Sequence, residues 1–102
     1  MAVISVTKDT FDLQVTHAQK TVLLDFWAQW CGPCRMLSPV VEEVAAERED
    51  IVVGKVNVDE EPELAQKFQI MSIPTLVVLK NGQIVKTAVG AMPKEDVLAL
   101  LE

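Results

Sequence analysis

The chain contains two cysteines, Cys31 and Cys34, separated only by Gly32 and Pro33 in the segment WCGPC. Two thiols this close together can bind a metal, form a structural disulfide or work as a reactive redox pair. A structural zinc site needs four ligands, and the chain offers one histidine, His17, in a different segment. Carboxylates or a second subunit would have to complete such a site, so the sequence disfavours a metal and predicts that His17 is a surface residue.

A purely structural disulfide between these cysteines would stabilise the chain little. The chain-entropy estimate for closing a loop of about four residues is only about 2 kcal/mol, against nearly 5 for a loop of about 100 residues. Strain in so small a ring reduces the gain further. A redox pair is the hypothesis that makes use of the short spacing.

The cysteine pair is expected at the junction between a strand and a helix. The segment TVLLDFWA, residues 21–28, is almost continuously apolar, which is typical of a strand buried on both faces. After the cysteines, apolar residues recur at intervals of three and four while glutamates occupy the other side, which predicts an amphipathic helix. Pro39 lies inside this helix and is expected to kink it near its first turns.

This placement gives the two thiols different expected roles. Cys31 would lie at the helix N-terminus, where free N–H groups and the helix dipole stabilise an anion such as a thiolate. Cys34 would lie one turn further along the same side, shielded from solvent and within reach of Cys31. Pro33 suits the first helical turn, and Gly32 allows another chain to approach closely. We therefore predict that Cys31 attacks and Cys34 resolves.

The remaining elements complete an alternating pattern. We predict strands over residues 3–6 and 51–58, with a helix beginning at a Thr7 cap between the first two strands. A short helix is expected near Pro62, and the acidic run 59–63 is interpreted as its solvated start. Strands 75–79 and 83–89 flank Asn81 and Gly82, a strong hairpin signal, and a last helix opens at Pro93. The order β-α-β-α-β followed by α-β-β-α predicts one α/β domain over residues 1–102, with a mixed five-stranded sheet flanked by four helices.

Composition narrows the possible partners. Half of the 102 residues are hydrophobic, 24% are charged and the net charge is −6, which is typical of a globular protein that binds neither nucleic acid nor an anionic membrane. Lys8, Asp9 and Asp12 interrupt the N-terminal region where a signal peptide would need an apolar run. A cytoplasmic location is therefore the default expectation.

Four segments, in order, resemble the thioredoxin family: DFWAQWCGPCRMLSP (25–39), VNVDEEPELA (56–65), IPTLVVLKNG (73–82) and VGA (89–91). The resemblance implies a thioredoxin fold and a monomeric reductant of many protein disulfides, with no bound cofactor beyond the redox-active pair. It also implies regeneration by a thioredoxin reductase, either a flavoprotein that uses NADPH or a ferredoxin-linked enzyme. Disulfide isomerases and periplasmic oxidants of this fold typically carry histidine between the cysteines, and glutaredoxins Pro-Tyr, so Gly-Pro favours a reductant. A disulfide oxidase or isomerase, or a non-enzymatic binding subunit, are the alternatives.

The resemblance also implies roles for other residues. Asp25, a carboxylate in an apolar strand, would lie beneath the cysteines and assist deprotonation of Cys34, and Lys55 would modulate its charge. A cis peptide bond before Pro74 would place a loop against the disulfide, with the backbone of Ile73 free to pair with an extended substrate.

A shallow apolar surface around Cys31 would receive the substrate. Trp27 is expected to pack in the core, whereas Trp30 is not. The residues expected on this surface are Trp30, Gly32, Pro33, Ile73, Pro74, Gly90 and Ala91.

Overall fold

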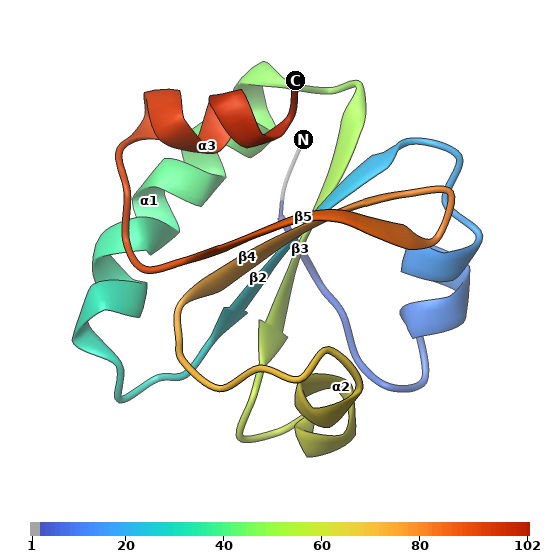
Figure 1. The fold of residues 1–102 in the computed structure, drawn as a ribbon, viewed down its shortest axis with the longest axis horizontal. Coiled ribbons are helices and arrows are strands. Elements are labelled where there is room, and N and C mark those ends of the chain that lie inside the picture. Colours follow the sequence, from blue (N-terminus) through green and yellow to red (C-terminus); the bar gives the residue numbers. More distant parts are fainter. Residues whose placement is uncertain (1–2) are drawn as a thin grey trace.

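A computed structural model describes residues 3–102, so Met1 and Ala2 of the expected domain lie outside the described residues. The elements are β1 (Ile4–Ser5), η1 (Asp12–Thr16), β2 (Thr21–Trp27), α1 (Gly32–Glu47), β3 (Ile51–Asn57), α2 (Pro62–Lys67), β4 (Thr75–Lys80), β5 (Gln83–Val89) and α3 (Lys94–Leu100). The predicted order of strands and helices is confirmed, and the sheet lies between helices on both sides (Figure 1). None of the helices within residues 3–102 is long and apolar enough to cross a membrane.

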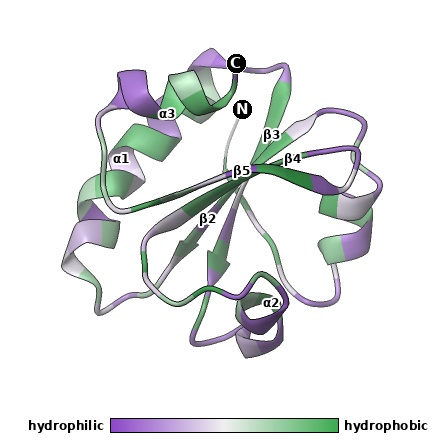
Figure 2. Ribbon diagram, in the orientation of Figure 1, coloured by the Kyte–Doolittle hydropathy of each residue, from purple (hydrophilic) through white to green (hydrophobic). Residues whose placement is uncertain are grey.

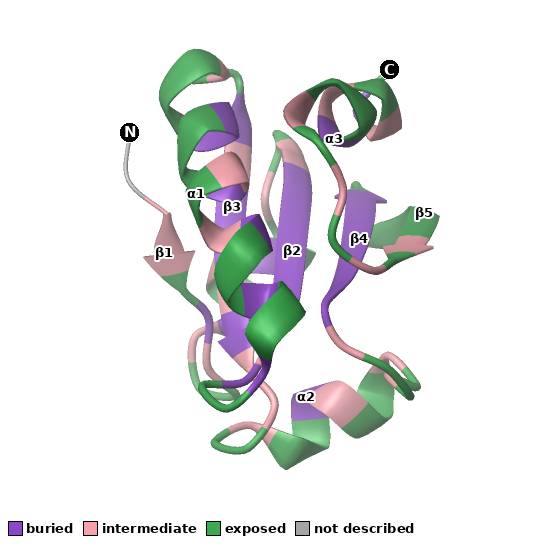
Figure 3. Ribbon diagram, turned by 90° about the vertical axis from the view of Figure 1, so that its left-hand side faces the viewer, coloured by how far each residue is buried: buried purple, intermediate pink, exposed green. Residues whose placement is uncertain are grey.

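The sheet has five strands in the order β1-β3-β2-β4-β5. β1 and β2 run parallel to β3, whereas β4 is antiparallel to both β2 and β5. β2 is therefore the central strand, and its five middle residues are buried, in agreement with the apolar run in the sequence (Figure 3). β2 ends at Trp27, and the cysteines follow a few residues beyond this carboxyl end of the strand.

Each face of the sheet has its own hydrophobic core. The α1 and α3 side contains Leu23, Leu37, Val41, Val44, Ala45, Ile51, Val53, Leu76, Val78, Val97 and Leu101. The η1 and α2 side contains Val6, Phe11, Val15, Val22, Leu24, Phe26, Val56, Leu64, Val77 and Leu79. α1 is amphipathic, with apolar and polar residues at helical spacing (Figure 2), and its buried residues are on the side that packs against the sheet. Successive residues of β2 thus serve opposite cores.

The hairpin between β4 and β5 forms where the sequence predicts it. Asn81 and Gly82 both have positive φ, 53° and 77°, as a tight type I′ turn requires. Lys80 then pairs with Gln83 directly across the turn. These two residues therefore set the register next to the turn, and a β-bulge or similar irregularity between Val78 and Leu79 shifts it further along the strands.

The first helix differs from the prediction. Instead of an α-helix from Thr7, the segment forms a turn followed by the π-helix η1, in which the His17 N–H donates to the Asp12 carbonyl at 2.9 Å. The Thr10 N–H donates to Thr7 Oγ1 and the Thr7 N–H donates to Thr10 Oγ1, which is the reciprocal pattern of a capping box, at the turn that precedes η1. Phe11 and Val15 are buried, so the apolar spacing identified the inward face although the backbone winds differently.

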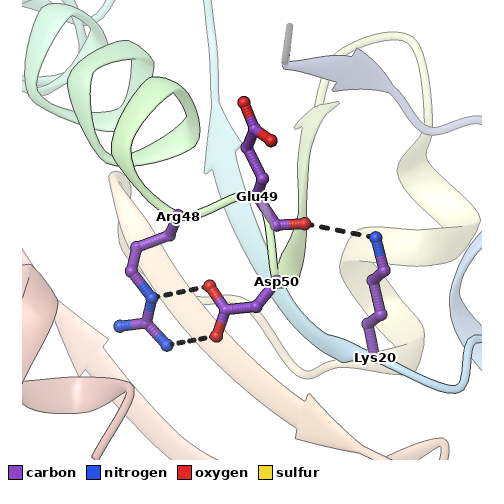
Figure 4. Close-up of polar contacts among 4 residues, drawn as sticks. All are labelled: Lys20, Arg48, Glu49 and Asp50. Carbon is purple, nitrogen blue, oxygen red and sulfur yellow. Dashed lines mark hydrogen bonds and ion pairs between the residues drawn. The ribbon is translucent and has the colours of Figure 1, made fainter.

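A polar turn closes the end of α1 that is remote from the cysteines. Arg48 donates two hydrogen bonds of 2.8 Å to the Asp50 carboxylate, and Lys20 donates to the Glu49 carbonyl at 3.2 Å (Figure 4). The hydrogen bonds from Arg48 lower the pKa of Asp50 to about 2. This exposed pair connects α1 to the start of β3.

Candidate active site

Cys31 and Cys34 form a disulfide at the junction of β2 and α1, with their Cα atoms 5.2 Å apart. Cys31 is the N-cap of α1, with extended backbone angles, and its Sγ accepts the Cys34 N–H at 3.2 Å. Gly32 and Pro33 are the first two residues of the helix. One first-turn N–H of α1, that of Cys34, is therefore directed at the sulfur of Cys31, and the positive end of the helix dipole lies at the same place, so a negative charge is stabilised there.

Both sulfur-bearing residues are buried in the disulfide form. Cys31 is 4% exposed and Cys34 is 3% exposed, so exposure does not distinguish the attacking thiol from the resolving thiol. The two cysteines cluster with Ala28, and Trp27 and Ile73 pack against them. The difference between the cysteines lies instead in the helix cap, because only the Cys31 sulfur accepts a first-turn N–H.

The Ile73–Pro74 peptide bond is cis and lies beside the disulfide. The Ile73 carbonyl oxygen is 3.9 Å from Cys31 Sγ, and neither polar backbone group of Ile73 bonds to backbone within residues 3–102. The Gly90 N–H donates to the Pro74 carbonyl at 2.8 Å, with Gly90 at a φ of 102° that favours glycine. Pro74 and Gly90 are therefore fixed next to each other, and Ala91 follows on the surface.

Trp30 lies on the surface, 68% exposed, and its indole Nε1 donates to Asp59 Oδ2 at 2.8 Å. The side chain borders an open groove that leads to the cis-proline loop. The residues that line this groove are Trp30, Val58, Ala65, Ile70, Met71, Ser72 and Ile73. Met71 is 95% exposed, so the surface beside Ile73 contains an apolar side chain that was not among the residues predicted from the sequence.

The acidic run 59–63 is more than a solvated helix start. Besides the bond between Asp59 and Trp30, Glu61 accepts the Lys8 N–H at 2.8 Å and Glu63 forms an ion pair with Lys8 at 3.0 Å. A single sequence gives no signal for these contacts, because the partners lie at least 29 residues away.

Gly32 and Pro33 are exposed next to the disulfide. Apart from its chain neighbours and the backbone of its own helix, no described protein atom lies within 4 Å of the position that a Cβ would occupy at Gly32, so no tertiary contact within residues 3–102 requires glycine there. The space beside Cys31 is open to another molecule.

Asp25 is 1% exposed in the middle of β2, between Lys55 on β3 and Leu76 on β4. It lies two residues after Leu23 and therefore on the side of the sheet that α1 covers. No protein group of residues 3–102 donates a hydrogen bond to either carboxylate oxygen. Burial raises the pKa of Asp25 from 3.8 to about 6, and the positive charge of Lys55 opposes part of this shift.

The Lys55 ammonium lies in the same layer. Its Nζ donates to Ser38 Oγ at 2.8 Å and lies 4.7 Å from the centre of a Trp27 ring. Ser38 follows Cys34 by one turn of α1. The prediction that Trp27 packs in the core is met only in part, because Trp27 is half-buried, packs against the cysteine cluster and contacts the Lys55 cation.

No group of three or more His, Cys, Asp or Glu side chains in the described part of the chain is arranged to hold a metal ion. What the site offers is a reversible disulfide at a helix N-terminus, a buried carboxyl group and an exposed apolar rim beside a cis-proline loop. Such a site on this fold defines a thiol-disulfide oxidoreductase.

Comparison with known proteins identifies the family. The thioredoxin family model matches residues 2–102. A thioredoxin of Mycobacterium tuberculosis is 52% identical over 98 residues, covering 95% of this chain and 84% of that protein. Thioredoxin 1 of a Nostoc species is 50% identical over 102 residues, covering 99% and 95%. A bifunctional thioredoxin reductase/thioredoxin of Mycobacterium leprae is 49% identical over 96 residues, covering 93% of this chain and 21% of its own length.

The chain belongs to the thioredoxin family. It is a protein-disulfide reductase whose Cys31–Cys34 pair cycles between dithiol and disulfide. The fold and the activity that the sequence resemblance implied are confirmed.

Proposed function

We propose that Cys31 is the attacking thiol and Cys34 the resolving thiol in the reduction of disulfides in other proteins. The observation that carries this assignment is the helix cap, in which Cys31 Sγ accepts the Cys34 N–H. A thiolate at this position is stabilised by the same N–H group and by the helix dipole, and the thiolate is the reactive form of cysteine.

The proposed reaction has two displacements. The Cys31 thiolate attacks one sulfur of the substrate disulfide, which forms a mixed disulfide and releases the other substrate sulfur as a thiolate that takes up a proton. Cys34 then loses its proton and attacks Cys31 Sγ, which releases the second substrate cysteine. Two electrons pass from the dithiol to the substrate, and the Cys31–Cys34 disulfide is left.

Asp25 is the proposed acceptor of the Cys34 proton, directly or through water. The carboxyl group is buried on the side of the sheet that carries α1, and its pKa of about 6 lets it exchange a proton near neutral pH. Lys55 adjusts this proton affinity through its positive charge.

The substrate is proposed to bind as an extended segment beside the cis-proline loop. The free backbone groups of Ile73 can pair with such a segment, in the manner of strand addition. Apolar contacts would come from the rim around Cys31, formed by Trp30, Gly32, Pro33, Ile73, Gly90 and Ala91. Pro74, which was also expected on this surface, is itself buried. A small rim of this kind suits brief contact with many protein substrates.

We also propose that the protein is a monomer with a single domain and that it acts in the cytoplasm. A thioredoxin reductase that draws on NADPH would regenerate its dithiol. The bifunctional relative, whose name joins a thioredoxin reductase to a thioredoxin, supports this source of electrons. The Gly-Pro dipeptide favours reduction over the oxidase or isomerase activity of related folds. A Cys31→Ser/Cys34→Ser double variant that keeps the biological role would instead identify a non-enzymatic binding subunit.

Trapping tests the roles of the two thiols. Cys34→Ser should accumulate mixed disulfides with a disulfide-containing protein, and mass spectrometry should locate the bond at Cys31. Cys31→Ser is the matched control and should trap little. Accumulation in the control alone would reverse the assignment.

A further inference from the structure

Lys55 and Asp25 face each other across β2 and β3 without forming a hydrogen bond. They are register partners on the neighbouring parallel strands β2 and β3. By strand alternation each lies on the same side as Leu23 and Val53, which pack in the core under α1, and Figure 3 shows α1 in front of these strands. Both Asp25 oxygens nevertheless lack a donor within residues 3–102. The Lys55 ammonium instead donates to Ser38 Oγ at 2.8 Å.

An ammonium group near a carboxylate ordinarily forms a hydrogen bond to it, and Lys55 does not do so with Asp25. A hydrogen bond between an ammonium and a carboxylate is charge-assisted and stronger than one to a neutral hydroxyl. The Ser38 hydroxyl lies on α1, so a bond to it draws the ammonium toward the helix layer, and the Trp27 ring supports the cation at 4.7 Å.

We propose that Ser38 is a positioning residue for Asp25: its hydroxyl accepts the Lys55 ammonium and thereby keeps that ammonium from forming a direct ion pair with the Asp25 carboxylate. The effect of Ser38 on the reaction rests on the proposed proton transfer from Cys34 to Asp25. The effect of Ser38 on the position of Lys55 does not depend on that transfer.

Few other charges act on this carboxylate. Cys34 of α1 is disulfide-bonded in this form and does not titrate, and the register partner on β4 is the apolar Leu76. The residues that α3 packs into this core, Val97 and Leu101, are also apolar. Glu60 and Glu61 line a small pocket together with Lys55. Burial has the larger influence on the pKa of Asp25, and Lys55 is the charge that modifies it, so the position of this ammonium adjusts the pKa.

Removal of the Ser38 hydroxyl should let Lys55 pair with Asp25. A cation in direct contact lowers the pKa of a carboxyl group by about 1 to 3 units. Ser38→Ala should therefore lower the pKa of Asp25 by at least about 1 unit, as measured by carbon-13 NMR titration of its carboxyl carbon in the disulfide form. Alanine is the best helix former, so the variant should keep α1 intact.

Ser38→Thr is the matched control, because it keeps a hydroxyl at the same position. Threonine should leave the pKa of Asp25 close to that of the parent protein. An unchanged or raised pKa in Ser38→Ala would overturn the proposal, as would a threonine variant that behaves like the alanine variant.

A second background tests whether the effect passes through the ammonium. In Lys55→Met, the additional change Ser38→Ala should no longer shift the titration of Asp25. A downward shift that persists without Lys55 would mean that Ser38 acts in another way, and it would overturn the proposal.

The pH dependence of protein-disulfide reduction separates this inference from the proposed role of Asp25. If Ser38→Ala shifts both the NMR titration and the inflection of the rate profile downward, both proposals are supported. A shifted titration with an unchanged rate profile supports the role of Ser38 and contradicts that of Asp25.

Discussion

Replacement of Asp25 by asparagine should make the disulfide form of the protein more stable, relative to the parent protein, at neutral and alkaline pH than at acidic pH. The carboxyl group is 1% exposed, and its pKa rises from 3.8 to about 6 on folding. A raised pKa means that ionisation is less favourable in the folded state. The stability associated with the protonated group is fully present below pH 3.8 and is lost as the pH rises through about 6.

The magnitude follows from the size of the shift. A difference of about 2 pKa units, at about 1.4 kcal/mol per unit, corresponds to about 3 kcal/mol at full ionisation. The asparagine side chain would keep the shape of the aspartate without its charge. Any cost of burying the amide group is the same at every pH, so it adds a constant offset and leaves the pH-dependent part unchanged.

Guanidinium unfolding of the two oxidised proteins between about pH 3 and about pH 8 measures this difference. The stability of Asp25→Asn relative to the parent protein should increase by about 3 kcal/mol across this range, with about half of the increase reached near pH 5. A stability difference that stays constant over this pH range would refute the assignment of Asp25 as a buried carboxyl group that ionises with a raised pKa. A difference that shrinks as the pH rises would refute the sign of the shift.

Three further changes have expected outcomes. Lys55→Met should raise the pKa of Asp25 above about 6, because Lys55 lowers it, and an NMR titration without an upward shift would contradict the charge interaction. Gly90→Ala should destabilise the protein by about 1 to 3 kcal/mol in denaturant unfolding, since alanine is strained at a φ of 102°, whereas an unchanged midpoint would be inconsistent with that backbone. Asp59→Ala should raise KM for a protein disulfide more than it lowers kcat, because the Trp30 indole loses its acceptor; equal effects on both would argue that Trp30 does more than bind substrate.

Much of the fold could be predicted because apolar spacing encodes which side of each element is buried. The central strand and the amphipathic α1 were identified in this way, and the hairpin was identified from the turn preference of Asn81 and Gly82. The π-helix η1 was not, since Phe11 and Val15 can face inward in either helical form. The choice between i+4 and i+5 hydrogen bonds depends on how the segment is anchored by the rest of the chain.

The site was predictable where chemistry depends on local sequence. The position of Cys31 at a helix start follows from WCGPC and the strand before it. The contacts of Ser38 and Asp59 were missed because each depends on a partner brought near by the fold, Lys55 and Trp30 respectively. A serine inside an amphipathic helix and an aspartate in an acidic run carry no distinguishing signal of their own.

The reduction potential of the Cys31–Cys34 couple tests the central claim most directly. Equilibration of the protein with defined ratios of reduced and oxidised glutathione, read out by alkylation of the free thiols, gives this value. A reductant of protein disulfides should have a potential of about −270 mV, the value typical of thioredoxins. A potential near about −120 mV, as in strongly oxidising periplasmic relatives of the fold, would contradict the assignment.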